Sequence, residues 1–519
     1  MCAEQSEPDI IELTLEEALQ GPEREHWEQA VKEELQSFEH NNAWEVVDAP
    51  SDGTIVKCKW VLKKKCDNDN NVRYRARLVA KGCTQKYGVD YEETFSPVVR
   101  HTTLRLLFAL SVQLNLDVIH LDVKTAFLNG DLDESIYMQK PMGFVCSSDK
   151  KVLKLKKAIY GLKQASRAWH KKVDNCMLSD GYSKSKYEPC LYTKIVGNSK
   201  TMVTLYVDDF FVFSNDKKEM KHLKDMLSNN FVIKDLGCVK ECLGMSVNFD
   251  EQNSTVTLSQ EKYIDQLLSR FNMTECKTVD TPMEANLKSK KESDSSCQNP
   301  YQHLIGCLMY LAVLTRPDIA YPVSYLSQFN NCNNEEQWIC AKRILRYLKK
   351  TKTVGLKYYK TDIVNIEGFV DADWGSNIND RRSYTGFCFT LSGAVISWSC
   401  SKQKCIALSS TEAEYVSISE ACKEAVFLRN LQYEVTRKMY KITLYNDSQS
   451  AQKLLINPVF HNRTKHIDVR YHFSREMIRN NIVQIIYLCT SDMPADLLTK
   501  GLSRVKHYKF MNALGIVKV

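Results

Sequence analysis

The stretch TLYVDDFFVFS, residues 204–214, decides the fold of the first half of the chain. The residues on both sides of Asp208 and Asp209 are strand formers, and only these two aspartates stand between them. A two-residue hairpin turn normally takes Asn-Gly or Gly-X, because its central residues need positive φ. Adjacent carboxylates between apolar strands cost stability unless cations neutralise them. The stretch therefore predicts a hairpin whose turn holds a divalent cation, with an ordinary acidic loop tip as the alternative.

A second strand has to supply a further carboxylate, and LDVIHLDVKTAFLNG, residues 116–130, offers one. Its alternating residues predict a strand with Asp117 and Asp122 on opposite faces. Hard cations such as Mg²⁺ are held by a few carboxylates together with substrate phosphates. Either aspartate would serve, and the spacing alone does not choose between them.

The C-terminal region repeats this pattern with other elements. IEGFVDADWG, residues 366–375, predicts a strand with Asp371 and Asp373 near its end, and GFCFTLSGAVISWS, residues 386–399, predicts a hairpin. STEAEYVSISEACKEAVFLRNL has helical spacing. KITLYND then predicts a strand that ends in Asp447, before a helical stretch. The predicted order is strand, hairpin, helix, strand, helix and helix.

Each acid in this region also has a purely local explanation. Glu414 fits a capping box with Thr411, Asp447 fits an N-cap, and Asp496 fits a first-turn acid favoured by the helix dipole. Periodicity does not separate Glu414 from Glu412, or Asp371 from Asp373. Acids at strand ends and helix starts are nevertheless typical of a second cation site.

Composition limits the class of protein. The chain has 519 residues, of which 44% are hydrophobic and 26% charged, so several globular domains are expected. Residues 1–34 hold eleven acids against Arg24 and Lys32, which predicts a solvated acidic segment around an amphipathic helix. Residues 150–172 hold nine Lys and Arg and no acid, a pattern that suits a polyanion. The 19 cysteines contain no CxxC pair, and we find no secretory signal or membrane span. These features predict a soluble intracellular protein.

Two groups of motifs carry a resemblance to a known family. LDVKTAFLNGDLDE, AIYGLKQASRAW and LYVDD, in this order, resemble the reverse transcriptase of copia-type LTR retrotransposons. The similarity begins near Trp44, includes RARLVAKG at residues 75–82 and continues to LTRPDIAY at residues 314–321. DADW, DRRSYTGF, SSTEAEY, NDSQSA, RTKHIDVRYHF and ADLLTK resemble the RNase H domain that follows this polymerase.

The resemblance implies an α+β polymerase right hand (fingers, palm and thumb) with a helical connector, followed by an α/β RNase H-like domain. The expected segments are an acidic N-terminal segment at 1–41, fingers and palm at 42–283, a linker or exposed loop at 284–299, thumb and connection at 300–361, and the RNase H-like domain at 362–519.

The resemblance also implies site residues. Each active site is expected to bind two Mg²⁺ ions, with Mn²⁺ as an alternative. The expected metal ligands are Asp122, Asp208 and Asp209 in the polymerase, and Asp371, Glu414, Asp447 and Asp496 in the nuclease. The expected nucleotide-binding residues are Phe127 against the sugar, Gln164 at the incoming nucleotide, and Arg77 and Lys63 at its triphosphate; residues 243–245 resemble the primer-grip turn.

The implied partners are an RNA template, a DNA primer, the RNA–DNA hybrid and dNTPs, and no membrane is expected. The implied location is the cytoplasm, within virus-like particles, with access to the nucleus. Integrase and other Pol parts are expected elsewhere in a parent polyprotein. Many RNases H have a histidine shortly before the last aspartate, whereas here Thr490 stands near that place. The alternatives are a domesticated or relic copy that binds nucleic acid without polymerising, and a stand-alone RNase H behind an inert scaffold.

Overall fold

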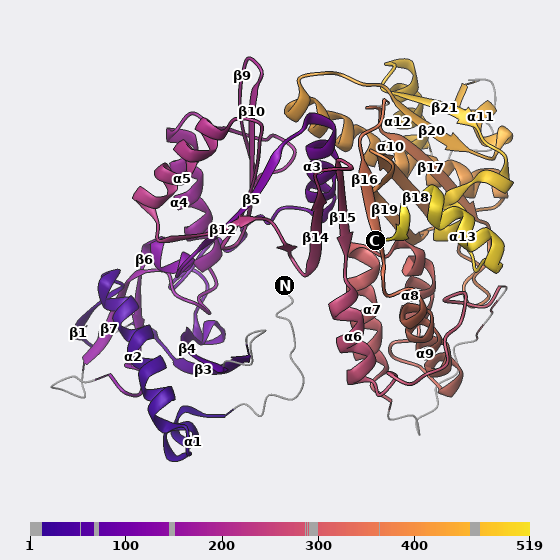
Figure 1. Ribbon diagram of the computed structural model, residues 1–519. Coiled ribbons are helices and arrows are strands. Elements are labelled where there is room, and N and C mark those ends of the chain that lie inside the picture. Colours follow the sequence, from indigo (N-terminus) through magenta and orange to yellow (C-terminus); the bar gives the residue numbers. More distant parts are fainter. Residues whose placement is uncertain are drawn as a thin grey trace. The chain divides into compact units, whose positions relative to one another are not determined.

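The computed structural model describes residues 13–51, 53–66, 72–144, 151–285, 287, 289, 299–362, 364–456 and 468–519, so most of the predicted linker at 284–299 lies outside the described residues. The chain separates into two compact units, which Figure 1 shows coloured along the sequence. Unit 1 is Met1–Val99, His120–Val212 and Asp216–Gly237; unit 2 is Arg100–Ile119, Phe213–Asn215 and Cys238–Val519. These units cut across the segments predicted from the sequence.

A two-stranded hairpin with two different faces forms part of unit 1. Strands β3 (Cys58–Cys66) and β4 (Val72–Ala80) pair antiparallel, and helices α1 (Leu15–Gln20) and α2 (Arg24–His40) bury its apolar face. Trp27 lies in this core, and the Tyr74 hydroxyl donates to Glu23 at 2.9 Å. These helices are amphipathic, as the sequence predicts: their apolar residues cover the hairpin, whereas acids such as Glu16 and Glu25 stay exposed.

The other strands of unit 1 form two sheets, and the central strands β10 (Ser199–Tyr206) and β11 (Asp209–Ser214) of the larger one are buried along most of their length. Helices α4 (Ala165–Ser179) and α5 (Lys217–Asn230) lie side by side, with the sulfurs of Cys176 and Met226 at 3.2 Å (Figure 1). The larger sheet has the order β12 (Ile233–Cys238), β5 (Asp117–Val123), β11 (Asp209–Ser214), β10 (Ser199–Tyr206), β9 (Leu191–Val196) and β8 (Ser183–Lys184). The smaller sheet has the order β1 (Trp44–Asp48), β7 (Lys151–Lys157), β6 (Asp131–Met138) and β2 (Ile55–Val56).

Unit 2 contains a five-stranded sheet and four neighbouring helices. The sheet joins distant parts of the sequence, in the order β13 (Glu241–Cys242), β14 (Met245–Asp250), β15 (Thr255–Ser259), β16 (Val354–Tyr359) and β22 (Ile516–Lys518). The predicted helical region holds α7 (Tyr301–Leu314), α8 (Ala320–Ser327) and α9 (Glu335–Lys350), beside α6 (Glu261–Arg270) (Figure 1). Residues 243–244 form a tight turn between β13 and β14, with φ of +49° at Leu243 and +79° at Gly244.

The second sheet of unit 2 follows the predicted order of elements as far as α12 (Asp468–Arg479), and then adds a strand, β21 (Val483–Tyr487), that was not predicted from the sequence. Strands β17, β20 and β21 run parallel, and β18 and β19 extend the sheet as an antiparallel hairpin. The strands are β19 (Ala394–Lys402), β18 (Tyr384–Leu391), β17 (Glu367–Asp373), β20 (Ile442–Asn446) and β21 (Val483–Tyr487), and the helices are α10 (Ser410–Thr436), α11 (Gln449–Ile456), α12 (Asp468–Arg479) and α13 (Arg504–Ala513). Among the described residues, we find no helix with the length and apolar character needed to cross a bilayer.

Buried arginines join the elements of unit 2. Arg105, on α3 (His101–Leu114), donates to the backbone oxygens of Ile396 at 2.7 Å and Leu314 at 2.8 Å. Arg316 and Asp318 form a fully buried ion pair at 2.7 Å, and the Tyr347 hydroxyl donates to Asp318 at 2.7 Å. Since a buried charge is tolerated only when it is paired and hydrogen-bonded, these groups fix the helices of unit 2 around them.

Replacing Arg316 by leucine should strongly destabilise unit 2, because the Asp318 charge stays buried without its partner. We expect unfolding to cost about 3–5 kcal/mol less than in the wild type. Urea unfolding followed by tryptophan fluorescence measures this difference. The matched control is Lys262→Ala, which removes one side of an exposed ion pair with Glu241. A Lys262→Ala effect as large as that of Arg316→Leu would contradict the role given to the buried pair.

Candidate metal centres

The hairpin between β10 and β11 has an unusual turn. Because β10 ends at Tyr206 and β11 begins at Asp209, the turn residues are Val207 and Asp208, one position earlier than the sequence predicts. Val207 has φ of +56°, which is strained for a β-branched residue and costs roughly 1–3 kcal/mol. Both turn carbonyls are held from outside: the Trp169 indole donates to that of Val207, and the Val123 amide donates to that of Asp208 at 2.9 Å. These bonds compensate the strain and fix the direction of the aspartates.

The structure brings Asp122, and not Asp117, to this turn. Strand β5 lies next to β11 in the sheet, and Asp117 is exposed at the start of β5. Burial, followed by the charges of Asp209 and Asp122, raises the pKa of Asp208 to about 6. The charges of Asp122 and Asp209 therefore reach Asp208, which places the three carboxylates in one neighbourhood.

His120 is a member of this site that sequence reasoning missed. Its Nε2 lies 2.6 Å from Asp209 Oδ1, and its ring stacks on Phe211 with centroids 4.7 Å apart. The strand alternation places His120 and Asp122 on one face of β5, so the signal was present in the sequence. Asp122, Asp208 and Asp209 are not among the groups that converge within 4.8 Å in the described part of the chain.

Arg77 and Phe127 meet through one tyrosine. The Arg77 guanidinium lies 4.6 Å from the centre of the Tyr160 ring, and Phe127 contacts the same ring edge-on at 4.6 Å. Arg77 Nε is buried and has no hydrogen-bond partner among the described residues. Gly161 permits this approach: its φ is +90°, and a Cβ there would lie 2.0 Å from the Ala80 oxygen. The glycine of AIYGL thus sets β4 against Tyr160.

Gln164 and Lys63 occupy less direct positions. The buried Gln164 amide accepts from Gln85 at 3.0 Å and donates to the Asp90 oxygen at 2.8 Å, so its polar atoms have partners within unit 1. Lys63 lies opposite Arg75 in the β3–β4 pair and therefore on the same face as Arg77. The structure brings neither side chain into a described contact with the three aspartates.

Six of the nine basic residues at positions 150–172 form ion pairs, with four acids between them. The pairs are Lys154 and Lys156 with Glu45, Lys157 and Lys172 with Asp131, Lys171 with Asp133, and Arg167 with Glu93. These four acids offset fewer than half of the nine positive charges, so the suitability of the run for a polyanion stays a prediction. The acids come from strands and loops distant in the sequence, so the count along the chain could not show them. A more available basic stripe is the β4 face that carries Arg73, Arg75 and Arg77.

In unit 2, three of the four predicted nuclease acids converge. Asp371, Glu414 and Asp447 each offer a carboxylate oxygen, and these oxygens lie within 4.8 Å of one another. The parallel register pairs Val370 with Asn446, which places Asp371 and Asp447 at the same edge of the sheet. Asp371 is only 1% exposed. Clustered carboxylate oxygens are the donor set that Mg²⁺ and Mn²⁺ take in proteins, so these residues fit such ions.

Neighbouring side chains take over the capping roles that could have explained these acids. Ser409 caps α10 by accepting from the Glu412 amide at 3.2 Å, and Glu412 accepts from the Leu408 amide at 2.8 Å. Ser448 accepts from the Ala451 amide at 3.2 Å at the start of α11. Glu414 and Asp447 are therefore not needed as caps and are free to face Asp371.

Burial makes this cluster electrostatically costly. Burial and the charges of Asp371 and Asp447 raise the pKa of Glu414 well above its ordinary value. Burial and Asp371 likewise raise the pKa of Asp496 to about 7. Asn446 donates to Glu414 at 2.9 Å, and Thr490, near the place of the absent histidine, donates to Asp447 at 2.6 Å. Neutral donors hold the carboxylates in position but do not cancel their charge.

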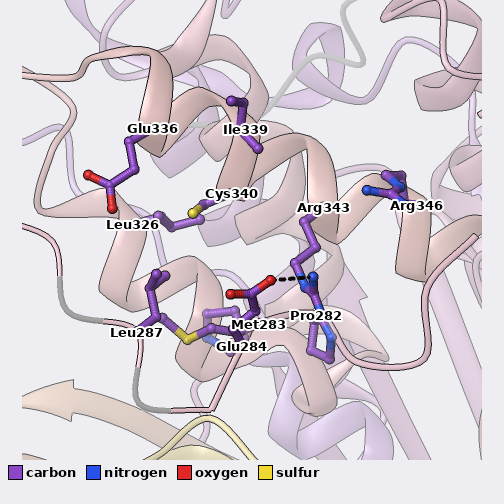
Figure 2. Close-up of a pocket in the computed structure, with 11 residues that line it drawn as sticks. Pro282, Met283, Glu284, Leu287, Leu326, Glu336, Ile339, Cys340, Arg343 and Arg346 are labelled. Carbon is purple, nitrogen blue, oxygen red and sulfur yellow. Dashed lines mark hydrogen bonds and ion pairs between the residues drawn. The ribbon is translucent and has the colours of Figure 1, made fainter.

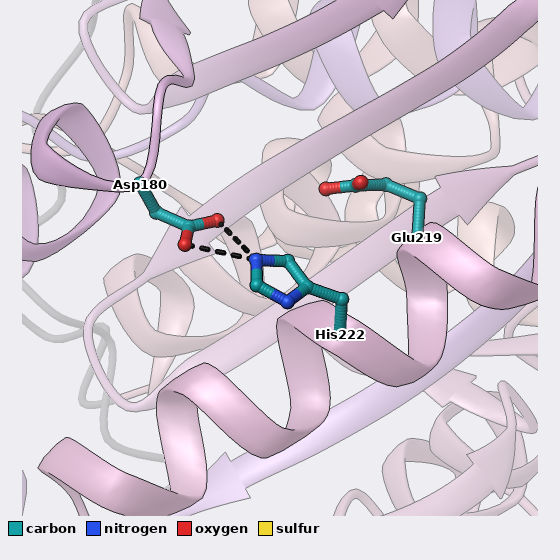
Figure 3. Close-up of side chains that lie close together, drawn as sticks. All are labelled: Asp180, Glu219 and His222. Atoms are coloured by element: carbon teal, nitrogen blue, oxygen red, sulfur yellow. Dashed lines mark hydrogen bonds and ion pairs between the residues drawn. The ribbon is translucent and has the colours of Figure 1, made fainter.

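Two other places are less suited to this chemistry. Asp180, Glu219 and His222 also converge (Figure 3), but Lys194 lies 2.9 Å from Glu219 and 3.5 Å from Asp180, so the acids are balanced internally. A cavity of about 300 Å³ is lined by residues around α9 (Figure 2). Its charged groups Glu284 and Arg343 pair with each other at 2.9 Å. Neither place holds an excess of buried negative charge.

Comparison with known proteins identifies the family of this chain. The family described as reverse transcriptase (RNA-dependent DNA polymerase) matches residues 41–285. The Pol polyprotein of transposon TNT 1-94 from Nicotiana tabacum is 44% identical over 95% of this chain, and the chain spans only 38% of that relative. A putative transposon Ty5-1 protein of Saccharomyces cerevisiae is 35% identical over 59% of this chain and 100% of its own length.

Among solved structures, a foamy viral protease-reverse transcriptase in complex with double-stranded DNA has a TM-score of 0.47 at 12% identity, covering 89% of this chain and 69% of that one. The sequence comparisons, together with the motifs of both units, settle the family. The chain belongs to the copia-type retrotransposon Pol polyproteins that carry a reverse transcriptase.

Proposed function

We propose that this chain is an RNA-directed DNA polymerase coupled to a ribonuclease H. The observation that carries the proposal is that one chain holds two separate carboxylate sites, one at the β10–β11 turn and one at the edge of the β17–β20 sheet. Membership of the reverse transcriptase family supports the first activity. The substrates would be an RNA template, a DNA primer and dNTPs, followed by the RNA–DNA hybrid.

In the polymerase site, Asp122, Asp208 and Asp209 would hold two divalent cations. When bound, these ions activate the primer 3′-hydroxyl and offset the charge of the leaving pyrophosphate. Arg77 has a buried Nε without a described partner, and it would donate to the triphosphate. Phe127, fixed against Tyr160, would form a rigid wall beside the sugar. Gln164 would act indirectly, because its amide already binds Gln85 and Asp90.

In the nuclease site, Asp371, Glu414, Asp447 and Asp496 would hold the cations that activate a water molecule toward the RNA strand. Asn446 and Thr490 would orient two of these ligands through the hydrogen bonds already present. Mutation of such outer partners typically costs 10- to 100-fold in metal affinity or activity. The lack of a histidine before Asp496 leaves Thr490 as the side chain that contacts Asp447 from that segment.

Substitutions in the two sites should separate the two activities. Asp208→Asn and Asp209→Asn should abolish primer extension on poly(rA) with Mg²⁺, while both variants still cleave a labelled RNA–DNA hybrid. Asp371→Asn should do the reverse. Because Asp208→Asn removes a buried, repelled charge and keeps the side-chain volume, its thermal midpoint in EDTA should not fall below that of the wild type. Losses of at least 100-fold are expected.

Each variant serves as the control for the other in this comparison. Equal extension by wild type, Asp208→Asn and Asp209→Asn would remove the polymerase assignment. No extension by any of them, with binding to hybrid retained, would identify a relic copy. Loss of both activities in Asp371→Asn would show that the two sites are not independent.

Cation binding should depend on pH with a definite sign. Since burial raises the pKa of Asp208 and Asp496, both carboxylates are ionised in the folded protein only above about pH 6–7. Without metal they make the fold less stable as pH rises from about 4 through this range. Divalent ions bind the ionised form and offset that loss.

Adding Mg²⁺ should therefore raise the thermal midpoint more at about pH 8 than at about pH 5.5. Differential scanning calorimetry in EDTA and in Mg²⁺ at both pH values measures the difference. Asp496→Asn, which lacks one of the two carboxylates, should show a smaller pH dependence. Equal increments at the two pH values would be inconsistent with metal binding at these carboxylates.

His120 should support the polymerase alone. His120→Leu removes the hydrogen bond to Asp209, and extension should fall roughly 10- to 100-fold. His120→Asn keeps a donor at this position and should retain most of the activity. Hybrid cleavage, which uses unit 2, is the internal control. A His120→Leu variant that extends primers like the wild type would show that the contact is only structural.

A further inference from the structure

Lys500 is a charged residue of the ADLLTK motif that the proposed function does not use. It follows Asp496 by four residues, and its Nζ lies 3.0 Å from Asp496 Oδ1 and 3.4 Å from Asp371 Oδ2. The Lys500 side chain is 34% exposed, whereas the side chains of both carboxylates are 2% exposed. One lysine therefore reaches from the surface into a buried group of acids.

The ammonium lies on one side of the acidic group. Asp371, Glu414 and Asp447 form the set that converges within 4.8 Å, and Asp496 is not part of that set. Asp496 is connected to it through Lys500, which contacts both Asp496 and Asp371. Thr499, the neighbouring residue, donates its hydroxyl to the same Asp371 oxygen, Oδ2. On one side of the cluster, Asp371, Glu414 and Asp447 converge. On the other side, the Lys500 ammonium already lies between Asp371 and Asp496.

The charges explain why a cation is needed on that side. Burial, followed by the charges of Asp371 and Asp447, raises the pKa of both Glu414 and Asp496, so each further negative charge in this group is unfavourable. Burial lowers the pKa of Lys500, but Asp371 and Asp496 outweigh it and keep the ammonium protonated. Apart from Lys500, the described hydrogen bonds to these carboxylates come from neutral groups, namely Asn446, Thr490, Thr499 and the amide of Ala372.

We propose that Lys500 is the built-in counter-ion of the nuclease site, and that its ammonium lies between Asp371 and Asp496 where a second divalent cation held by these two carboxylates would bind. This inference rests on the proposed nuclease function. The two cations then bind with unequal affinities. The first takes the converging set of Asp371, Glu414 and Asp447 without hindrance, and the second binds only as Lys500 moves out toward solvent. The partial exposure of Lys500 permits that movement.

A surface ion pair would behave differently. Exposed pairs contribute little, and removing the lysine of such a pair leaves a carboxylate that water solvates. Removing Lys500 leaves two carboxylates that are nearly inaccessible to water, so the metal-free protein should lose stability. The same change should favour a second divalent ion, because the competing positive charge is gone.

The test counts and ranks Mn²⁺ sites in the full chain by isothermal titration calorimetry. All proteins carry Asp208→Asn and Asp209→Asn, so that the measured ions belong to the nuclease site. The variants are Lys500→Met, which removes the charge and keeps the stem, and Lys500→Arg, which keeps the charge. The matched control is Lys423→Met, because Lys423 forms an exposed pair with Glu420 at 3.1 Å in the same unit. Thermal unfolding in EDTA is measured in parallel.

With Lys500 intact, two Mn²⁺ affinities should differ clearly. In Lys500→Met the weaker one should tighten by roughly tenfold or more, and the unfolding midpoint in EDTA should fall below that of Lys423→Met. Lys500→Arg should retain the unequal affinities. Should Lys500→Met not fold, Lys500→Gln, which keeps a donor without the charge, gives the same comparison.

Unchanged Mn²⁺ affinities in Lys500→Met, together with a midpoint equal to that of Lys423→Met, would overturn the role of Lys500 and leave the nuclease proposal standing. Absence of Mn²⁺ binding in every protein, including the one with Lys500 intact, would overturn both.

Discussion

Carboxylates held close together and away from water repel one another, and this constraint organises both candidate sites. At the β10–β11 turn, Asp209 and Asp122 add to burial in raising the pKa of Asp208. At the edge of the β17–β20 sheet, Asp371 and Asp447 do the same for Glu414. A fold for which these acids were only structural would gain by replacing some of them. Divalent cations, which take carboxylate oxygens as ligands, would offset this repulsion.

Neighbouring residues carry out the structural roles that the acids could otherwise have served. Ser409 and Ser448 cap the helices that begin beside Glu414 and Asp447. The Trp169 indole donates to the carbonyl oxygen of Val207, whose φ is positive. This hydrogen bond helps the turn to keep its conformation without a glycine. In unit 2, buried Arg316 and Arg105 join the helices to the sheets. Other residues therefore cap the helices, stabilise the strained turn and pair with the buried charges. The acidic side chains of the two sites are not needed for these structural roles.

Many elements of the fold were predictable from the sequence. The contacts around the two sites were not, and the reasons can be identified. Alternation and helical spacing predicted β17, the β18–β19 hairpin and α10, because each pattern is local. Periodicity could not tell whether Glu412 or Glu414 belongs to the acidic cluster. The structure separates them, because Glu412 binds the backbone beside the Ser409 cap and Glu414 faces Asp371. The contacts of His120 with Asp209, Thr490 with Asp447 and Lys500 with Asp371 join residues from 43 to 129 positions apart, whereas Lys500 and Asp496 are only four positions apart. The ion pairs of the basic run were not predictable, because its acidic partners lie on other elements.

The most direct test is anomalous diffraction from crystals of the chain grown with an RNA–DNA duplex and soaked in Mn²⁺. Density is predicted at two separate places, beside Asp122, Asp208 and Asp209 and beside Asp371, Glu414 and Asp447. Crystals that diffract well and show duplex in place, but no anomalous peak at either group of carboxylates, would contradict the assignment of both sites.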